Sequence, residues 1–175
     1  MELLDAIEPV GEMVSLIGSR DFGAGFYRIA NELIGIDHCT VFMCANDNPR
    51  TLVAEANCEK TAARVRSLAD IYIREAYVQD PVWGTFQSAP HAGCSTFLLS
   101  PTELADEGYR REFYDKPNIK HELALTTVIN GDRIYAGFYR ENGRPHFSDR
   151  SAELLKYCGR TIMQVLHKHA EISLL

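Results

Sequence analysis

The sequence feature that most constrains the fold is the dipeptide Asn130-Gly131, which lies between two β-favouring segments. Residues 123–129 precede it and residues 133–139 follow it, and both segments are rich in branched and aromatic side chains. Asn-Gly tolerates the positive φ angles that two-residue hairpin turns require. The sequence therefore predicts an antiparallel hairpin at this position.

Helical segments separate this hairpin from a second predicted one, in which the turn-rich residues 46–50 join strands at 39–45 and 51–57. Apolar residues recur with helical spacing in five other segments. The predicted helices cover residues 2–18, 22–34, 61–77, 101–114 and 148–169, and a short strand covers residues 96–99. Hairpins separated by helices favour an α+β fold, here an α/β/α sandwich with a central antiparallel sheet and helices on both faces. We find no repeat or linker, so residues 1–175 are predicted to form a single domain.

Composition excludes several classes of protein. The formal net charge is −6, and the basic residues are scattered, which argues against direct binding to nucleic acid. No apolar run approaches the roughly 20 residues that span a bilayer, and the acidic N-terminus does not resemble a secretory signal. We therefore expect a cytoplasmic protein that does not contact membranes.

Motifs for catalysis or metal binding are absent from the sequence. The six histidines do not have zinc-site spacing, and there is no phosphate-binding loop or Gly-x-Ser-x-Gly elbow. The five cysteines are odd in number and never spaced Cys-x-x-Cys, so they are interpreted as small apolar residues. We expect no catalytic residue, no metal and no cofactor.

A candidate binding site lies where the helix predicted for residues 61–77 stops before Asp80-Pro81. Proline disfavours helical geometry in the preceding residue, so Asp80 is predicted to be extended. Tyr72, Tyr77 and Trp83 surround this acid in sequence, which is typical of an apolar pocket with one polar anchor. The alternative interpretation is a helix C-terminus whose aromatic residues fill the core.

The last helix carries more apolar surface than one core stripe needs, because eight apolar side chains between Leu154 and Leu166 cover over half its circumference. One side of the helix can face the sheet, and the other needs a partner. We therefore predict a homodimer formed through the first helix, residues 1–20, and the last helix, residues 148–172.

Five short motifs, in this order and spacing, resemble the N-terminal GAF/PAS-like ligand-binding domain of LuxR-type transcriptional regulators. They are Tyr77-Val-Gln-Asp-Pro-Val82, Glu107-Gly-Tyr-Arg-Arg-Glu-Phe-Tyr114, Lys120-His-Glu-Leu123, Gly137-Phe-Tyr-Arg140 and Pro145-His-Phe-Ser148. The resemblance covers residues 22–169 and implies a GAF-like fold. It also implies a role in transcription regulation and quorum sensing, with DNA bound only through a helix-turn-helix domain that is absent from this chain.

The resemblance further implies a pocket between the sheet and the segment bearing Asp80. In receptors for acyl-homoserine lactones, the aspartate of this Asp-Pro motif accepts a hydrogen bond from the ligand amide. The candidate ligand-binding residues are Asp80, Tyr72, Tyr77, Trp83, Phe42, Phe97 and Thr127. The family's helix tryptophan is replaced by Ser67, and a second expected tryptophan is missing near Cys94. These departures argue against a lactone and favour either a different small molecule or no ligand.

Two alternative functions follow from the same residues. One is a stand-alone interaction module that pairs with a full-length regulator and sequesters it through the apolar surface of the last helix. The other is a cysteine-based GAF-like reductase or redox sensor, which requires an exposed thiol of low pKa. Cys58 and Cys94 are the candidates for that thiol.

Overall fold

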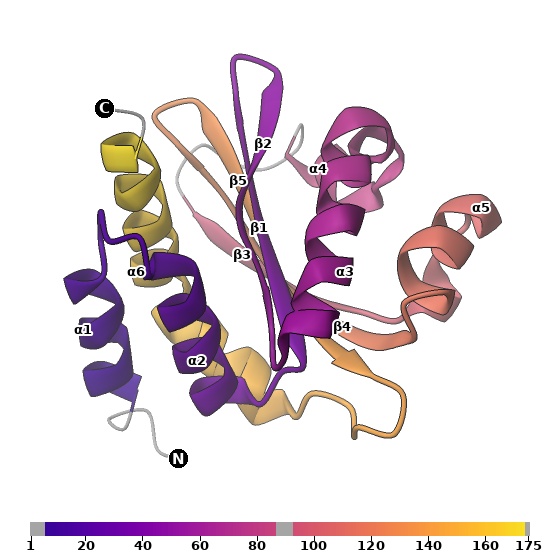
Figure 1. Ribbon diagram of the computed structural model, residues 1–175, viewed down its shortest axis with the longest axis horizontal. Coiled ribbons are helices and arrows are strands. Elements are labelled where there is room, and N and C mark those ends of the chain that lie inside the picture. Colours follow the sequence, from indigo (N-terminus) through magenta and orange to yellow (C-terminus); the bar gives the residue numbers. More distant parts are fainter. Residues whose placement is uncertain (1–5, 87–92, 174–175) are drawn as a thin grey trace.

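A computed structural model of the chain describes residues 6–86 and 93–173. One antiparallel sheet lies between two layers of helices (Figure 1). The five strands of the sheet are β1 (His38–Ala45), β2 (Asn48–Ala56), β3 (Cys94–Leu99), β4 (Ile119–Ile129) and β5 (Asp132–Glu141). Their order in the sheet is β2-β1-β5-β4-β3, so pairing of β1 with β5 joins the two hairpins.

Both predicted hairpins are present. The turn between β4 and β5 consists of Asn130 and Gly131, with φ angles of 54° and 92°, as the dipeptide predicts. The turn between β1 and β2 is tighter than predicted, because only Asn46 and Asp47 leave the strands. Pro49 is tolerated inside β2 since β2 is an edge strand with an unpaired side.

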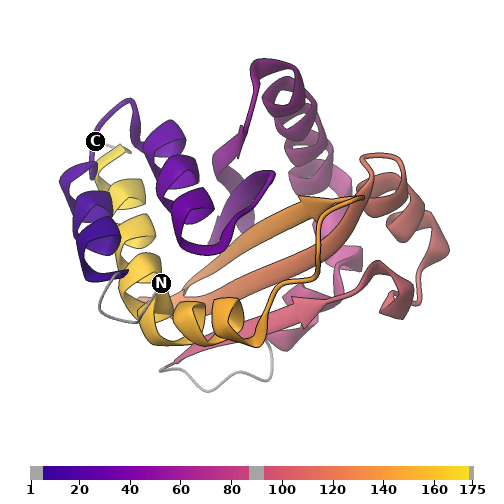
Figure 2. The same cartoon turned by 90° about the horizontal axis from the view of Figure 1, so that it is seen from below.

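The helices divide between the two faces of the sheet, as Figure 2 shows from a second direction. The helices are α1 (Ile7–Ser15), α2 (Phe22–Ile34), α3 (Glu59–Ile71), α4 (Pro81–Thr85), α5 (Glu107–Arg110) and α6 (Asp149–Ser173). One face carries α1, α2 and α6, and the other carries α3, α4 and α5 (Figure 1). The α/β/α sandwich with a central antiparallel sheet is therefore confirmed.

Several predicted helices differ from the observed ones at their ends. The first helix is shorter than residues 2–18: α1 covers Ile7–Ser15, and residues 1–5 lie outside the described part of the chain. The helix predicted for residues 61–77 is α-helical only to Ile71 and continues as a π-helical turn over Tyr72–Ala76. The wider turn occurs where Tyr72 enters the candidate site, and such turns are frequent at functional sites.

The helix predicted for residues 101–114 is interrupted. A 3₁₀ turn, Pro101–Glu103, has the expected capping box with Ser100, and the chain then becomes extended at Leu104. A separate helix, α5, begins at Glu107, and Asp106 is its N-cap. The Asp106 side chain accepts a hydrogen bond from the Tyr109 backbone N–H at 2.9 Å. A π-helical turn, Arg111–Asp115, follows α5.

Alternation along the strands produces two separate cores. On β1, Val41 and Met43 join the core under α1, α2 and α6, whereas Phe42 and Cys44 join the core under α3, α4 and α5. This is the period-two alternation of a strand whose two faces are both covered.

Arg140 fixes the connection from β5 to α6. Its guanidinium donates hydrogen bonds to the backbone carbonyls of Ile34 and Gly35 at the end of α2, and to that of Pro145. It also lies over the ring of Phe147, 4.2 Å from its centroid. These contacts hold Arg140 and the segment 145–148 together at the start of α6.

Helix α6 buries most of the apolar surface that the sequence assigned to a partner. Leu155, Ile162, Met163 and Leu166 are all buried within the chain, whereas Tyr157 remains 68% exposed. In the ranges 6–86 and 93–173, no helix combines the length and the apolar character needed to cross a membrane.

Candidate functional site

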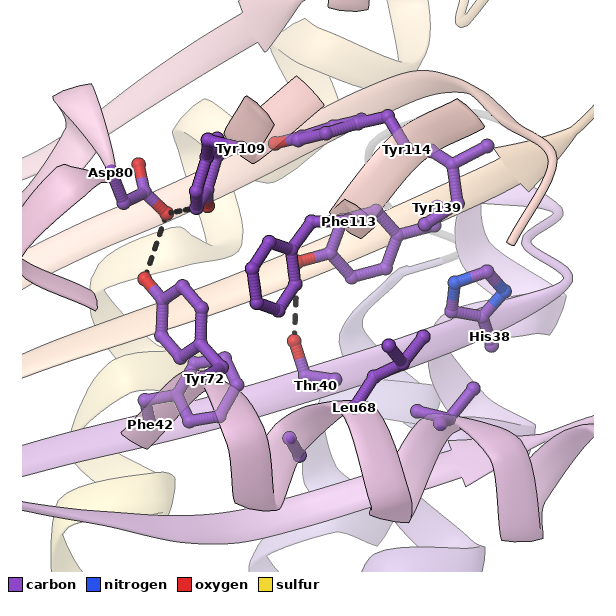
Figure 3. A pocket seen from close by; sticks show the side chains of 13 residues that line it. His38, Thr40, Phe42, Leu68, Tyr72, Asp80, Tyr109, Phe113, Tyr114 and Tyr139 are labelled. Carbon is purple, nitrogen blue, oxygen red and sulfur yellow. Dashed lines mark hydrogen bonds between the residues drawn. The ribbon is translucent and has the colours of Figure 1, made fainter. Parts of the chain in front are cut away.

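A cavity of about 50 Å³ lies on the α3 face of the sheet, between β1, α3 and the segment that follows α5. Figure 3 shows this cavity with its aromatic and polar side chains converging from all three segments. Its walls are aromatic, aliphatic and polar: Phe42, Tyr72, Tyr109, Phe113, Tyr114, Tyr139, Val65, Leu68, Ala69, Ile119, His38, Thr40 and Asp80. The volume is several times the roughly 10–15 Å³ that a cavity needs to hold one water molecule, so it accommodates a compact group.

Asp80 anchors one end of the cavity. Its backbone is extended, as the following proline predicts, and its side chain caps α4 by accepting a hydrogen bond from the Val82 N–H at 2.8 Å. The hydroxyls of Tyr72 and Tyr109 donate to the same carboxylate at 2.7 and 2.9 Å (Figure 3). Trp83 completes the network, because its Nε1–H donates to the Tyr72 hydroxyl at 2.5 Å.

These contacts decide how Asp80 is stabilised. The side chain is buried, and burial raises the pKa of the carboxyl, while the three hydrogen bonds oppose that rise. A buried carboxylate without donors costs several kcal/mol. Here Tyr72, Val82 and Tyr109 supply the donors, so Asp80 is satisfied within the chain.

A second acid, Glu122 on β4, lies behind the tyrosines of the cavity wall and is fully buried. The hydroxyls of Tyr114 and Tyr135 donate to its two carboxylate oxygens. Burial and the neighbouring charge of Asp80 raise the pKa of Glu122 to about 7, against the opposing effect of the tyrosine hydrogen bonds. Asp80 is thus the acid of the cavity wall, and Glu122 is joined to that wall through the Tyr114 hydroxyl.

The tyrosines remain protonated donors. Burial, followed by the charges of the two acids, raises the pKa of Tyr72, Tyr109, Tyr114, Tyr135 and Tyr139 well above the usual tyrosine value. Each hydroxyl therefore keeps its proton near neutral pH and can point it at an acceptor.

Gly137 makes room for Tyr139 in this arrangement. A Cβ at position 137 would collide with the Tyr139 hydroxyl. With glycine there, that hydroxyl shares a hydrogen bond with Thr40 Oγ1 at 3.2 Å (Figure 3). The His38 ring stacks on Tyr139 at 4.9 Å, and burial, with a smaller contribution from Arg64, lowers the pKa of His38 to about 3. His38 is therefore neutral.

The structure brings together four of the seven predicted site residues. Asp80, Tyr72 and Phe42 line the cavity, and Trp83 holds the Tyr72 hydroxyl from behind. Tyr77 packs edge-on against Trp83, with centroids 5.7 Å apart, and does not reach the cavity in the described part of the chain.

Two predicted residues lie elsewhere. Phe97 is on the correct face of the sheet and packs against the same core, but it does not line the cavity. The prediction for Thr127 is wrong, because Thr127 faces the α6 side of the sheet. It pairs with Ile134 on β5, and its hydroxyl donates to the Gly93 carbonyl at 3.1 Å.

Sequence reasoning missed the residues that α5 and β4 contribute. Tyr109, Phe113, Tyr114 and Glu122 are not among the seven predicted site residues. A signal for Glu122 exists in the sequence, since it is an acid directly before the apolar run 123–125 of a predicted strand. Such an acid is rarely buried without partners.

The two candidate cysteines, Cys58 and Cys94, differ in their exposure and in the pKa of their thiols. Cys58 is exposed at the start of α3, and its hydrogen bond with Thr61 lowers the pKa of the thiol. Cys94 is half-buried, and burial raises the pKa of its thiol to about 11. Among the described residues, no three His, Cys, Asp or Glu side chains are placed to hold a metal ion.

Comparison with known proteins gives matches only at the level of structure. No family model matches the sequence, and no curated protein matches it significantly. The ligand-binding domain of VqsR from Pseudomonas aeruginosa superposes with a TM-score of 0.64 at 13% identity, over 94% of this chain and 95% of that one. The N-acylhomoserine lactone dependent LuxR-family transcription factor CepR2 from Burkholderia cenocepacia superposes with a TM-score of 0.69 at 10% identity, over 98% and 97%.

A GAF domain/HD domain protein from Geobacter sulfurreducens also matches, with a TM-score of 0.57 at 12% identity over the whole of both chains. The fold is thus the GAF-like fold that the ligand-binding domains of LuxR-type regulators share. The structural resemblance expected from the motif order is confirmed.

Proposed function

We propose that this chain is a cytoplasmic small-molecule-sensing domain of a LuxR-type transcriptional regulator. The observation that carries the proposal is the cavity at Asp80, where an extended Asp-Pro turn places a buried carboxylate among aromatic walls. Ligand sites are typically apolar clefts with a few oriented polar groups, and this cavity has that composition. The shared fold with VqsR and CepR2 supports the same assignment.

Ligand binding in this proposal involves a change at the cavity wall. Drug-sized ligands occupy pockets of roughly 300–1,000 Å³, whereas this cavity measures about 50 Å³. Phe113 is the half-buried aromatic residue of the wall, and it packs on Tyr109 with centroids 4.9 Å apart. We infer that a larger ligand displaces Phe113 and the turn Arg111–Asp115 that carries it.

Dimerisation is the second part of the proposal. Apolar side chains remain exposed on α1 and α6, namely Ile7, Val14, Tyr157 and Ile172. A homodimer through these two helices covers them, and DNA binding belongs to a helix-turn-helix domain outside these residues. Light scattering on the purified chain tests the dimer, with the double change Ile7→Glu and Val14→Glu expected to give monomers.

Thermal unfolding against a panel of metabolites, including acyl-homoserine lactones, tests ligand sensing. A ligand at a hundredfold excess over its Kd stabilises the fold by about 2.7 kcal/mol, which raises the midpoint by roughly 5–10 °C. Ala69→Val adds two methyl groups to the cavity wall and is expected to abolish the shift while leaving the unliganded midpoint nearly unchanged.

Asp80→Asn is the paired test of the anchor, and Asp106→Asn is its matched control, because Asp106 also caps a helix but is exposed. We expect the ligand shift to be lost in Asp80→Asn and kept in Asp106→Asn. If a broad panel gives no shift in the wild type, the sensing role of Asp80 fails. The interaction module then becomes the better account.

A further inference from the structure

Aromatic rings form nearly half of the cavity wall. Six of its thirteen lining residues are Phe or Tyr, and they come from β1, β5, the turn after α3, helix α5 and the turn that follows it. Phe42 stacks on Tyr72 at 4.4 Å, and Phe113 meets Tyr72 edge-on at 5.8 Å. The faces of such rings carry the negative part of the ring quadrupole, which attracts cations.

The acids behind these rings have no positive partner. In the described residues, neither Asp80 nor Glu122 forms an ion pair, and their hydrogen-bond donors are hydroxyls and one backbone N–H. The groups that alter the pKa of each acid include no lysine, arginine or histidine. Any negative charge on them is therefore not neutralised by the chain.

Two cationic side chains on α3 and β5 are engaged with other partners. Arg64 pairs with Glu141 at 2.6 Å, and Arg133 pairs with Asp47 while lying over Trp83. His38, the only basic residue in the described cavity wall, is buried and makes no hydrogen bond at Nδ1. The described cavity wall thus combines aromatic rings with one acid, Asp80, and is joined through Tyr114 to a second acid, Glu122, while it holds no charged basic residue.

We propose that this cavity selects a small organic cation, an ammonium or quaternary ammonium group bearing compact apolar substituents. Rings and acids together form an aromatic cage, the arrangement that recognises such cations. The proposal rests on the proposed function, because it names the class of ligand that the sensing site takes. It also predicts that carboxylate ligands are rejected, since a second negative charge beside Asp80 is unfavourable.

Three probes of nearly equal shape test the charge preference: choline, its neutral analogue 3,3-dimethylbutan-1-ol, and the anion 3,3-dimethylbutanoate. Dissociation constants are measured by ¹H–¹⁵N NMR titration of the wild-type chain. We expect choline to bind at least tenfold more tightly than the neutral alcohol, and the anion to show no binding. This comparison needs no variant, so a folding defect cannot obscure it.

Two variants then test which side chains produce the preference for choline over the neutral alcohol. Glu122→Gln removes one acid and is expected to weaken choline about tenfold while leaving the alcohol unchanged. Phe42→Leu removes another ring of the cavity wall and is expected to act in the same direction. Glu112→Gln, a neighbouring acid paired with Lys116 outside the cavity, is the control and should change neither probe.

The outcomes separate this inference from the proposed function. Equal binding of choline and the alcohol, or tighter binding of the alcohol or the anion, overturns the cation preference and leaves the sensing site intact. If none of the three probes binds while neutral compounds of the metabolite panel do, the preference is also overturned. If nothing binds in either experiment, both the preference and the sensing function fail.

Discussion

The two faces of the sheet differ in chemistry although the same strands build both. Towards α1, α2 and α6, strand β4 presents Leu123 and Leu125 to a core that is almost entirely apolar. Towards α3, α4 and α5, the same strand presents Glu122, and the surrounding segments supply Asp80 and five tyrosines. Because successive side chains of the strand point to opposite faces, a change in the apolar core can alter stability without altering the cavity.

The largest effect expected from this comparison is on stability alone. Phe26 is fully buried in the apolar core, 6.1 Å from Phe138 between ring centroids. Phe26→Ala is expected to lower the free energy of unfolding by about 3–5 kcal/mol, because it leaves a cavity. Urea denaturation measures the loss, and ligand affinity of the folded fraction should be unchanged. A loss below about 1 kcal/mol, or a large change in affinity, contradicts the division between the faces.

The next effect is a dependence of stability on pH that originates in the polar face. The pKa of Glu122 is about 7 in the folded chain and 4.5 as its ordinary value. Between about pH 4.5 and 7, Glu122 is protonated in the folded state and ionised in the unfolded state. The free energy of unfolding therefore falls as the pH rises through this range. The contribution is up to about 3 kcal/mol, since one pKa unit corresponds to about 1.4 kcal/mol.

Glu122→Gln removes this contribution, and the difference between wild type and variant isolates it. His38 produces the opposite slope: its pKa of about 3 lies below the usual value, so its contribution is lost as pH falls below about 6.5. Urea denaturation of both chains at several pH values should show a difference that grows from pH 4.5 to 7 and then levels. A difference that stays constant contradicts the assignment.

A smaller effect is expected from one hydroxyl of the polar face. Tyr72→Phe keeps the ring but removes the group that joins Trp83 to Asp80. We expect a loss of about 1–3 kcal/mol in the free energy of unfolding, because the Trp83 N–H and one Asp80 oxygen lose a partner. Denaturation followed by tryptophan fluorescence measures it, since Trp83 is the single tryptophan. An unchanged midpoint argues against the network.

The smallest effect is expected at the exposed cap of α5. Asp106→Asn retains a side-chain oxygen for the Tyr109 N–H, and asparagine caps helices about as well as aspartate. The free energy of unfolding, followed by thermal denaturation, should therefore change by less than about 0.5 kcal/mol. A loss as large as that of Tyr72→Phe indicates that the two caps are coupled through Tyr109.

The sequence predicts the parts of this structure that depend on local chemistry. Asn130-Gly131 defines its turn by backbone preference, and the proline after Asp80 defines that residue's extended geometry. Glu122 could not be placed in the site from local patterns, because its contacts with Tyr114 and Tyr135 depend on the register of β4 and on the position of α5. Thr127 was misplaced for the same reason: one residue along a strand changes the face.

The most direct test of the central claim, that recognition belongs to the α3 face, is a ¹H–¹⁵N NMR map of a bound ligand. The compound from the metabolite panel that raises the unfolding midpoint most is titrated into the wild-type chain. The account predicts that amide shifts centre on Thr40, Ala69 and Tyr109, with little change at Phe26 and Leu166. Shifts that centre instead on α1, α2 and α6 would contradict it.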